Sequence, residues 1–115
     1  MKSINNYQVL IKKINVSNMD DLKSVGDQIY QKLSNGIAAL FCEGEGKPIA
    51  VVIVGKNLTN NGFHAGEIAK HIGLFMDGGG GGKPHMATAG GKNIDSILNA
   101  INKTNVLIHD MLEGK

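Results

Sequence analysis

The sequence feature that most constrains the fold is a run of five consecutive glycines, Gly78 to Gly82. It lies inside the stretch from Asn60 to Asn93, which reads NNGFHAGEIAKHIGLFMDGGGGGKPHMATAGGKN. Glycine opens positive φ angles and lets another molecule approach the main chain, but each one costs up to about 1 kcal/mol in conformational freedom. Because an ordinary core does not require such a run, we expect it to form a ligand-contacting loop.

The spacing around the glycine run excludes two known phosphate-binding patterns. A nucleotide P-loop needs a first glycine and a final Ser or Thr, but Asp77 and Pro84 stand at these positions. A dinucleotide fingerprint directly follows a strand, whereas these glycines follow a predicted helix. A less specific interpretation remains, in which successive N–H groups form a concave nest for a phosphate or carboxylate, with Lys83 at its exit.

Hydrophobic periodicity in the first part of the chain predicts a strand and then a packing helix. Tyr7 to Ile14 combines β-branched and aromatic residues, and apolar residues recur at helical spacing between Leu22 and Leu33. Ser17 with Asp20 resembles a capping box, so we expect the helix to begin there. Gly36 is placed as its C-terminal cap.

The middle of the chain predicts a buried hairpin and a second helix. Ile37 to Cys42 and Ile49 to Val54 are nearly continuous apolar runs joined by a short glycine-containing link, which favours antiparallel strands covered on both faces. A polar loop from Lys56 to Phe63 follows, with a turn predicted near its end. Apolar residues between Ile68 and Phe75 then share one helical face.

Beyond the glycine run the sequence predicts a short strand, Met86 to Ala89, and a last helix from Ile94 to Leu112 with Asn93 as its N-cap. These elements define the expected fold class, which is α/β. We expect a single domain over residues 1–115 with a mixed β-sheet and packed α-helices. The expected element order is strand, helix, strand, strand, helix, glycine loop, helix.

Composition fits one soluble domain. The chain has 115 residues, of which 42% are hydrophobic and 19% charged, as in globular proteins. Since no apolar run approaches the roughly 20 residues that span a bilayer, and the start lacks a signal peptide's apolar region, we expect a cytoplasmic protein without a membrane partner. The lone Cys42 sits in an apolar run and is predicted to be a small buried hydrophobe.

The charge pattern restricts how a polyanion can be bound. All twelve basic residues are lysines, and the formal net charge is only +2. Without arginine the chain has no side chain for bidentate phosphate or guanine recognition. Contacts to a nucleic acid would therefore be point-charge contacts that weaken with salt.

Several separated blocks carry a family resemblance: HAGE at 64–67, the five glycines, KPHMA at 83–87 and AGGK at 89–92. In this order they resemble the C-terminal, DHHA1-type accessory domain of alanyl-tRNA synthetase, which is similar to the accessory domain of the DHH phosphoesterases. The resemblance covers nearly the whole chain. It departs where Lys83 replaces the usual Arg, His85 the usual Asp and Thr88 the usual Gln. The first change loses the fork geometry of arginine, and the second changes the sign of any local electrostatic role.

The resemblance implies a tRNA-binding segment from the C-terminal part of a longer synthetase. That enzyme joins alanine to its tRNA with ATP and hydrolyses mischarged tRNA in a separate domain. The implied partners are tRNA and the rest of the synthetase chain, and ATP, magnesium and zinc are expected only in the parent enzyme. No cofactor, metal or catalytic residue is therefore expected in this segment. The expected RNA-contacting residues are His64, Gly66, Glu67, Gly78, Gly79, Gly80, Gly81, Gly82, Lys83, Pro84, His85, Gly90, Gly91 and Lys92.

Two other functions stay open at this point. The chain resembles the nucleotide-binding accessory domain of a DHH phosphoesterase, although Lys83-Pro84 separate the glycines from His85, which in those relatives follows directly. The other open function is a dimerisation or structural module without RNA contact, in which the apolar stripe of the last helix faces another chain. A metal site from His64, Glu67 and His71, completed by His85, matches no tight zinc spacing. The simpler interpretation is a surface pair of Glu67 with Lys70 or His71.

Overall fold

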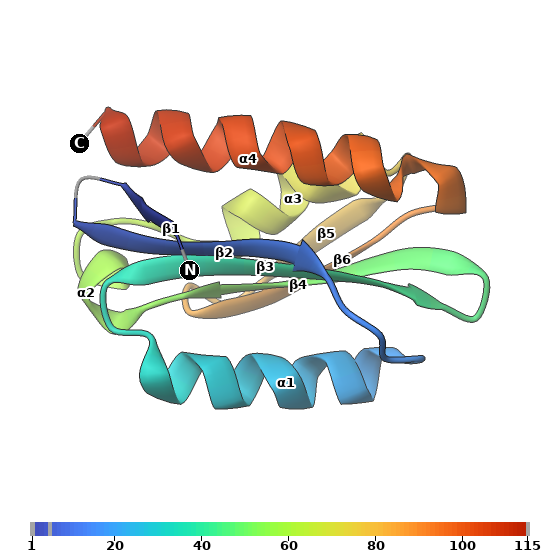
Figure 1. Ribbon diagram of the computed structural model, residues 1–115, viewed down its shortest axis with the longest axis horizontal. Helices are drawn as coiled ribbons and strands as arrows, with labels where there is room; N and C mark the ends of the chain where they lie inside the picture. The colour runs from blue at the N-terminus through green and yellow to red at the C-terminus, as the bar shows by residue number, and fades with distance from the viewer. Residues whose placement is uncertain (1, 5, 115) are drawn as a thin grey trace.

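The computed structural model describes residues 2–4 and 6–114, and the side chains from Asn6 onward. The domain has three layers, with α1 on one face of a sheet and with α3 and α4 on the other (Figure 1). The elements are β1 Lys2–Ile4, β2 Tyr7–Lys13, α1 Met19–Lys32, β3 Gly36–Gly44, β4 Lys47–Val54, α2 Lys56–Thr59, α3 Ala65–Phe75, β5 Gly79–Gly82, β6 Met86–Gly90, a 3-10 turn Ile94–Ser96 and α4 Ile97–Glu113.

The sheet is mixed, as predicted. Its strand order is β1-β2-β3-β4-β6-β5, in which β2 and β3 are parallel and the other pairs are antiparallel. The β3–β4 hairpin runs in register from the pair Ile37 and Val54 to the pair Gly44 and Lys47. This confirms the predicted hairpin and the α/β class.

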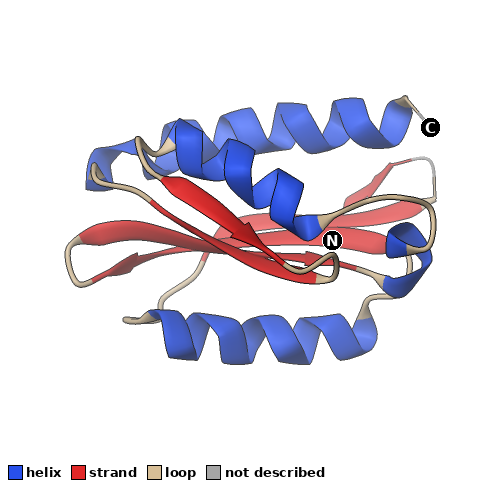
Figure 2. Cartoon of the chain, turned by 180° about the vertical axis from the view of Figure 1, so that it is seen from behind, coloured by secondary structure: helices blue, strands red, loops and turns tan. Residues whose placement is uncertain are grey.

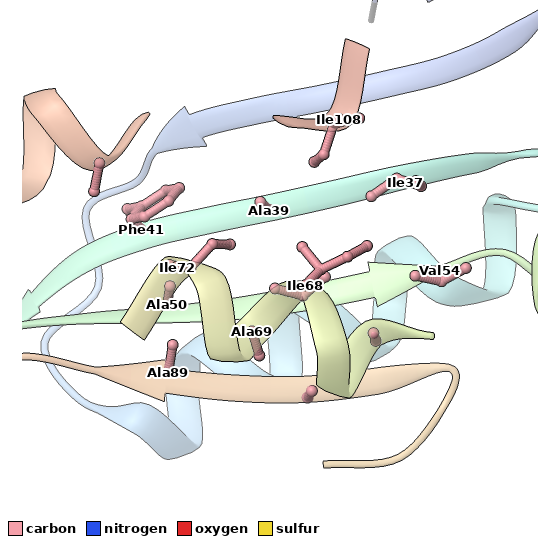
Figure 3. Packing of buried hydrophobic residues seen from close by; sticks show 14 of the residues in the cluster. Ile37, Ala39, Phe41, Ala50, Val54, Ile68, Ala69, Ile72, Ala89 and Ile108 are labelled. Carbon is pink, nitrogen blue, oxygen red and sulfur yellow. The ribbon is translucent and has the colours of Figure 1, made fainter. Parts of the chain in front are cut away.

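The continuous apolar runs are explained by a core on each side of β3 and β4. Ile37, Ala39 and Phe41 pack with residues of α3 and α4, among them Ile68 and Ile108 (Figure 3). The alternate residues of β3 pack instead with Leu22 and other residues of α1; these are Ala38, Leu40 and Cys42. Because successive side chains of a strand point to opposite faces, a strand between two helical layers needs apolar residues at every position.

Both predicted ends of α1 need correction. Asn18 is the N-cap, and its side-chain oxygen accepts a hydrogen bond from the backbone N–H of Asp21 at 2.8 Å, so the cap lies one residue after Ser17. Gly36 does not cap the helix, which ends at Lys32, but begins β3. A Cβ at Gly36 would lie 2.3 Å from the carbonyl oxygen of Gln8. That glycine permits the close approach of two paired strands.

The connections after β4 are more regular than predicted. The polar loop from Lys56 to Phe63 contains the one-turn helix α2, and the predicted turn follows it, with Gly62 at φ 91°. Asn93 caps the 3-10 turn that precedes α4, its side chain accepting from the N–H of Asp95 at 3.0 Å. The predicted strand at Met86 is confirmed as β6.

The predicted glycine loop is wrong: Gly79–Gly82 is an edge strand, β5, paired with β6. A glycine run carries no hydrophobic pattern, so only the partners on either side of it determine its conformation. Within the described residues, no helix is long and apolar enough to cross a membrane.

Candidate nucleic-acid interface

Pairing of β5 with β6 engages alternate N–H groups of the glycine run. Its register pairs Gly79 with Gly90 and Gly81 with Thr88, and the N–H of Lys83 donates to the carbonyl of Met86 at 2.9 Å to close the turn. Antiparallel strands alternate between hydrogen-bonded and non-bonded residue pairs. From the Lys83–Met86 bond, the N–H groups of Gly81 and Gly79 point toward β6. The N–H groups of Gly80 and Gly82 alternate with these and point away from β6, so the glycine run does not present the successive N–H groups of the expected nest.

On one face of β5, glycine is required by the packing of α3, which runs along the strand (Figure 2). A Cβ at Gly80 would lie 2.3 Å from the carbonyl oxygen of Ala69. A Cβ at Gly73 of α3 would lie 2.3 Å from the carbonyl carbon of Gly79, and one at Gly66 would lie 2.7 Å from the oxygen of Gly82. Helix and strand thus meet backbone to backbone, so Gly66 and Gly80 have a structural role.

On the opposite face, nothing in the fold requires glycine. A Cβ at Gly79 or Gly81 would meet no atom within 4 Å, and one at Gly90 would meet only a methyl carbon of Ile49 at 3.9 Å. None of the three has a positive φ. We call Gly79, Gly81 and Gly90 the glycine patch. Its members share one side of the hairpin, because Gly79 pairs with Gly90 and lies two residues from Gly81.

The glycine patch borders an open cleft on the α1 side of the sheet. The cleft has a volume of about 430 Å³ and is lined by Lys23 and Asp27 of α1 together with Gly81, Lys83, His85 and Thr88 of the hairpin. Gly82, Met86 and Ala87 complete its lining. Lys83 is exposed at the hairpin turn, so its ammonium group is free to reach a phosphate.

His85 is held against α1 rather than displayed as a free ring. Its ring centroid lies 5.1 Å from that of Tyr30 with an interplanar angle of 49°, and the side chain is half-buried. Its carbonyl accepts from the N–H of Val54 at 3.0 Å. The aromatic contact fixes the hairpin turn relative to α1.

The other predicted contact residues near the turn serve mainly to begin α3. His64 is the N-cap, and its Nδ1 accepts from the N–H of Gly66 at 3.0 Å. The carbonyl of the exposed Pro84 accepts from the N–H of Ala65 at 2.8 Å. Glu67 lies 3.8 Å from the Lys70 ammonium, and both side chains are exposed. Such a surface pair contributes little to stability.

Three predicted residues lie at the opposite end of β5, away from the cleft. A Cβ at Gly78 would lie 2.0 Å from the carbonyl oxygen of Gly90, and one at Gly91 would lie 2.1 Å from that of Met76. The N–H of Lys92 also donates to the Met76 carbonyl, at 3.1 Å, while its side chain is exposed. The sequence prediction therefore grouped residues that the fold separates.

Metal and thiol chemistry find no support in the described residues. No group of three His, Cys, Asp or Glu side chains in residues 2–4 and 6–114 could hold a metal ion. Cys42 is fully buried, and burial, followed by the nearby Glu43 carboxylate, raises the pKa of its thiol. A protonated, buried thiol is a poor nucleophile.

Sequence reasoning missed the contribution of α1 to the cleft. Lys23 and Asp27 are four residues apart and share a face of the helix, which helical periodicity shows. Periodicity does not show which part of the sheet that face overlooks. The hairpin lies more than fifty residues further along the chain, and only the sheet order brings the two together.

The class of this domain can now be stated. The chain belongs to the DHHA1 domain family, whose family model matches residues 6–108. The individual proteins whose sequences it resembles are alanine–tRNA ligases. The chain is 38% identical over 113 residues to the enzyme of Oceanobacillus iheyensis and 34% identical over 111 residues to that of Natranaerobius thermophilus. These matches cover 98% and 96% of the chain and 13% of each relative.

A solved structure has the same fold. The C-Ala domain of Aquifex aeolicus alanyl-tRNA synthetase superposes with a TM-score of 0.82 at 19% identity, over 94% of this chain and 96% of that one. The chain therefore has a C-Ala-type fold and spans about an eighth of the length of the ligases it matches, as the 13% coverage shows.

Proposed function

We propose that this chain is a tRNA-binding domain of an alanine–tRNA ligase, which supports the ATP-dependent attachment of alanine and the editing of mischarged tRNA. The observation that carries the RNA-binding role is the glycine patch. Its three glycines weaken the hairpin at the edge of the sheet without being required by packing or by backbone angle. Departures from local stability rules of this kind are expected at functional sites.

The mode of binding is recognition of shape and backbone. The glycine patch lets an RNA surface approach the peptide planes, and Lys83 supplies a point charge for a phosphate. His85, in contact with Tyr30, lines the cleft beside Lys83. His64 contacts the RNA less directly, since its Nδ1 is already used as the helix cap.

The chemistry of alanine attachment and editing belongs to other parts of the ligase chain, with ATP, magnesium and zinc bound there. This domain supplies affinity and placement for tRNA, in contact with the rest of the synthetase in the cytoplasm. The similarity of nearly the whole chain to alanine–tRNA ligases supports this assignment.

The test is tRNA binding by the 115-residue chain, with a transcript of alanine tRNA and an RNA duplex of equal length as control. Gly81→Val places a branched side chain where a Cβ meets no atom within 4 Å, so the fold should remain intact. We expect it to lower tRNA affinity roughly tenfold, a typical loss when a central contact is obstructed. Equal affinity of the wild type for tRNA and duplex would contradict the proposal.

A second candidate is a dimerisation or structural module without RNA contact. It is favoured by three exposed apolar side chains on α3 and α4: Leu74 is 68% exposed, Leu98 72% and Val106 62%. This function requires a stable dimer in solution and no tRNA binding. Analytical ultracentrifugation of the wild type and of Leu98→Lys separates the two functions, because only dimerisation should respond to that change.

A further inference from the structure

The α1 wall of the cleft carries two unengaged charges. Lys23 and Asp27 are exposed and one helical turn apart, and both line the cleft opposite the hairpin. The ion pairs found in the described part of the chain join Lys13 to Glu43 and Lys70 to Glu67, so neither α1 residue is neutralised by a salt bridge there. Both are free to meet a ligand.

The size and floor of the cleft fit a flat group. A volume of about 430 Å³ lies within the range of small-ligand pockets, which is roughly 300–1,000 Å³. Gly81 lines the cleft without a side chain, and its cross-strand partner Thr88 lies beside it on the same face of the hairpin. A planar ring can therefore lie against the main chain of Gly81.

The position of Asp27 restricts what that ring can be. A carboxylate beside an RNA phosphate is repelled, and this repulsion opposes the attraction of Lys23 and Lys83. A carboxylate that meets the edge of a base instead accepts hydrogen bonds, since an ionised carboxylate is an acceptor at both oxygens. Among the four RNA bases, only guanine presents two adjacent donors on its Watson–Crick edge, N1–H and the 2-amino group.

We propose that this cleft receives an unpaired guanine of the bound RNA and that Asp27 determines its identity. The Asp27 carboxylate accepts from N1–H and the 2-amino group, and the ring lies against the backbone of Gly81 beside Thr88. Lys23 and Lys83 face the adjoining phosphates. This inference rests on the proposed function, because it takes RNA as the ligand.

The experiment uses mononucleotides as probes, so that base preference is measured apart from tRNA affinity. Amide shifts of Gly81, Lys83 and Thr88 are followed by NMR during titration of the 115-residue chain with GMP, IMP and AMP. We expect GMP to bind roughly fivefold or more tightly than AMP, because two charge-assisted hydrogen bonds are lost with adenine. IMP, which lacks the 2-amino group, should fall between them.

Asp27→Asn is the decisive variant, because an amide offers only one acceptor in place of two. It should bring the GMP-to-AMP ratio close to one. Asp20→Asn is the matched control, since it removes the same charge from the same helix outside the cleft, and it should keep the wild-type ratio.

The outcomes separate this inference from the proposed function. Equal binding of GMP and AMP to the wild type, a GMP preference that survives Asp27→Asn, or no shifts at the three amides would each overturn the guanine site. Any of these results together with specific tRNA binding leaves the proposed function in place. Loss of the GMP preference in Asp27→Asn together with no tRNA binding would instead retain the cleft as a guanine site and reject the tRNA assignment.

Discussion

The two faces of β5 contain the same residue type for different reasons. On the α3 face, Gly80 is glycine because the main chain of the helix leaves no room for a Cβ, whose nearest neighbour would be 2.3 Å away. On the cleft face, Gly79 and Gly81 have open space and ordinary φ angles. A glycine run can therefore combine a packing requirement with an accessible surface, on alternate residues of one strand.

The largest expected effect comes from adding one methyl group to each face. Gly80→Ala forces α3 away from β5 and should lower the free energy of unfolding by about 3 kcal/mol, as in overpacked sites. Gly81→Ala should raise it by about 0.5 kcal/mol, because glycine in a strand is unfavourable. Urea denaturation followed by circular dichroism measures both. Equal effects of the two substitutions would remove the distinction between the faces.

A double substitution on the cleft face should increase stability and reduce binding together. Gly79→Thr with Gly81→Thr introduces β-branched residues at two strand positions with open space, which should stabilise the domain by about 1–2 kcal/mol. The same side chains cover the glycine patch, so tRNA affinity should fall. Thermal unfolding and tRNA titration on one preparation test both parts. A stabilised variant with full affinity would place the RNA elsewhere.

The start of α3 offers a smaller test of the packed face. His64→Ala removes the cap on the Gly66 N–H and should destabilise the domain by about 1 kcal/mol. His64→Asn keeps a capping oxygen and should restore most of that loss. Since α3 holds β5 from behind, tRNA affinity should change far less than in the cleft-face variants, provided that the measurement is made where both proteins are folded.

The smallest expected effect distinguishes the two ends of the hairpin. Lys83→Ala removes a charge at the cleft, whereas Lys92→Ala removes one at the other end of β5. We expect Lys83→Ala to weaken tRNA binding roughly threefold at low salt and to make its salt dependence less steep, since one phosphate contact is lost. Lys92→Ala should do neither. A stronger effect from Lys92 would move the interface toward that end.

The sequence predicts those parts of the fold whose hydrophobic pattern is strong. The β3–β4 hairpin is confirmed because its runs are apolar at every position, and α1 because Leu22 and its neighbours repeat at helical spacing. The predicted ends of α1 are less accurate than its predicted existence. Ser17 and Asn18 are both good capping residues, and Gly36 suits a helix end as well as a close strand contact.

The glycine strand could not be recognised from its own residues. Its conformation depends on β6, whose Ala87 and Ala89 enter the core, and on the small residues of α3. For the site, the motif identified Lys83 and His85, which the structure does place at one cleft. It did not identify Lys23 and Asp27, because their proximity to the hairpin follows from the strand order of the whole sheet.

The open space above Gly79 and Gly81 has a consequence for engineering and for natural variation. Any selection that rewards heat resistance or expression would favour larger residues at these two positions early, since they improve the strand and disturb nothing around it. Under the proposed function, such a lineage would gain stability and lose RNA binding without any change in a folding assay. Continued selection for binding would then be what retains glycine at these two positions.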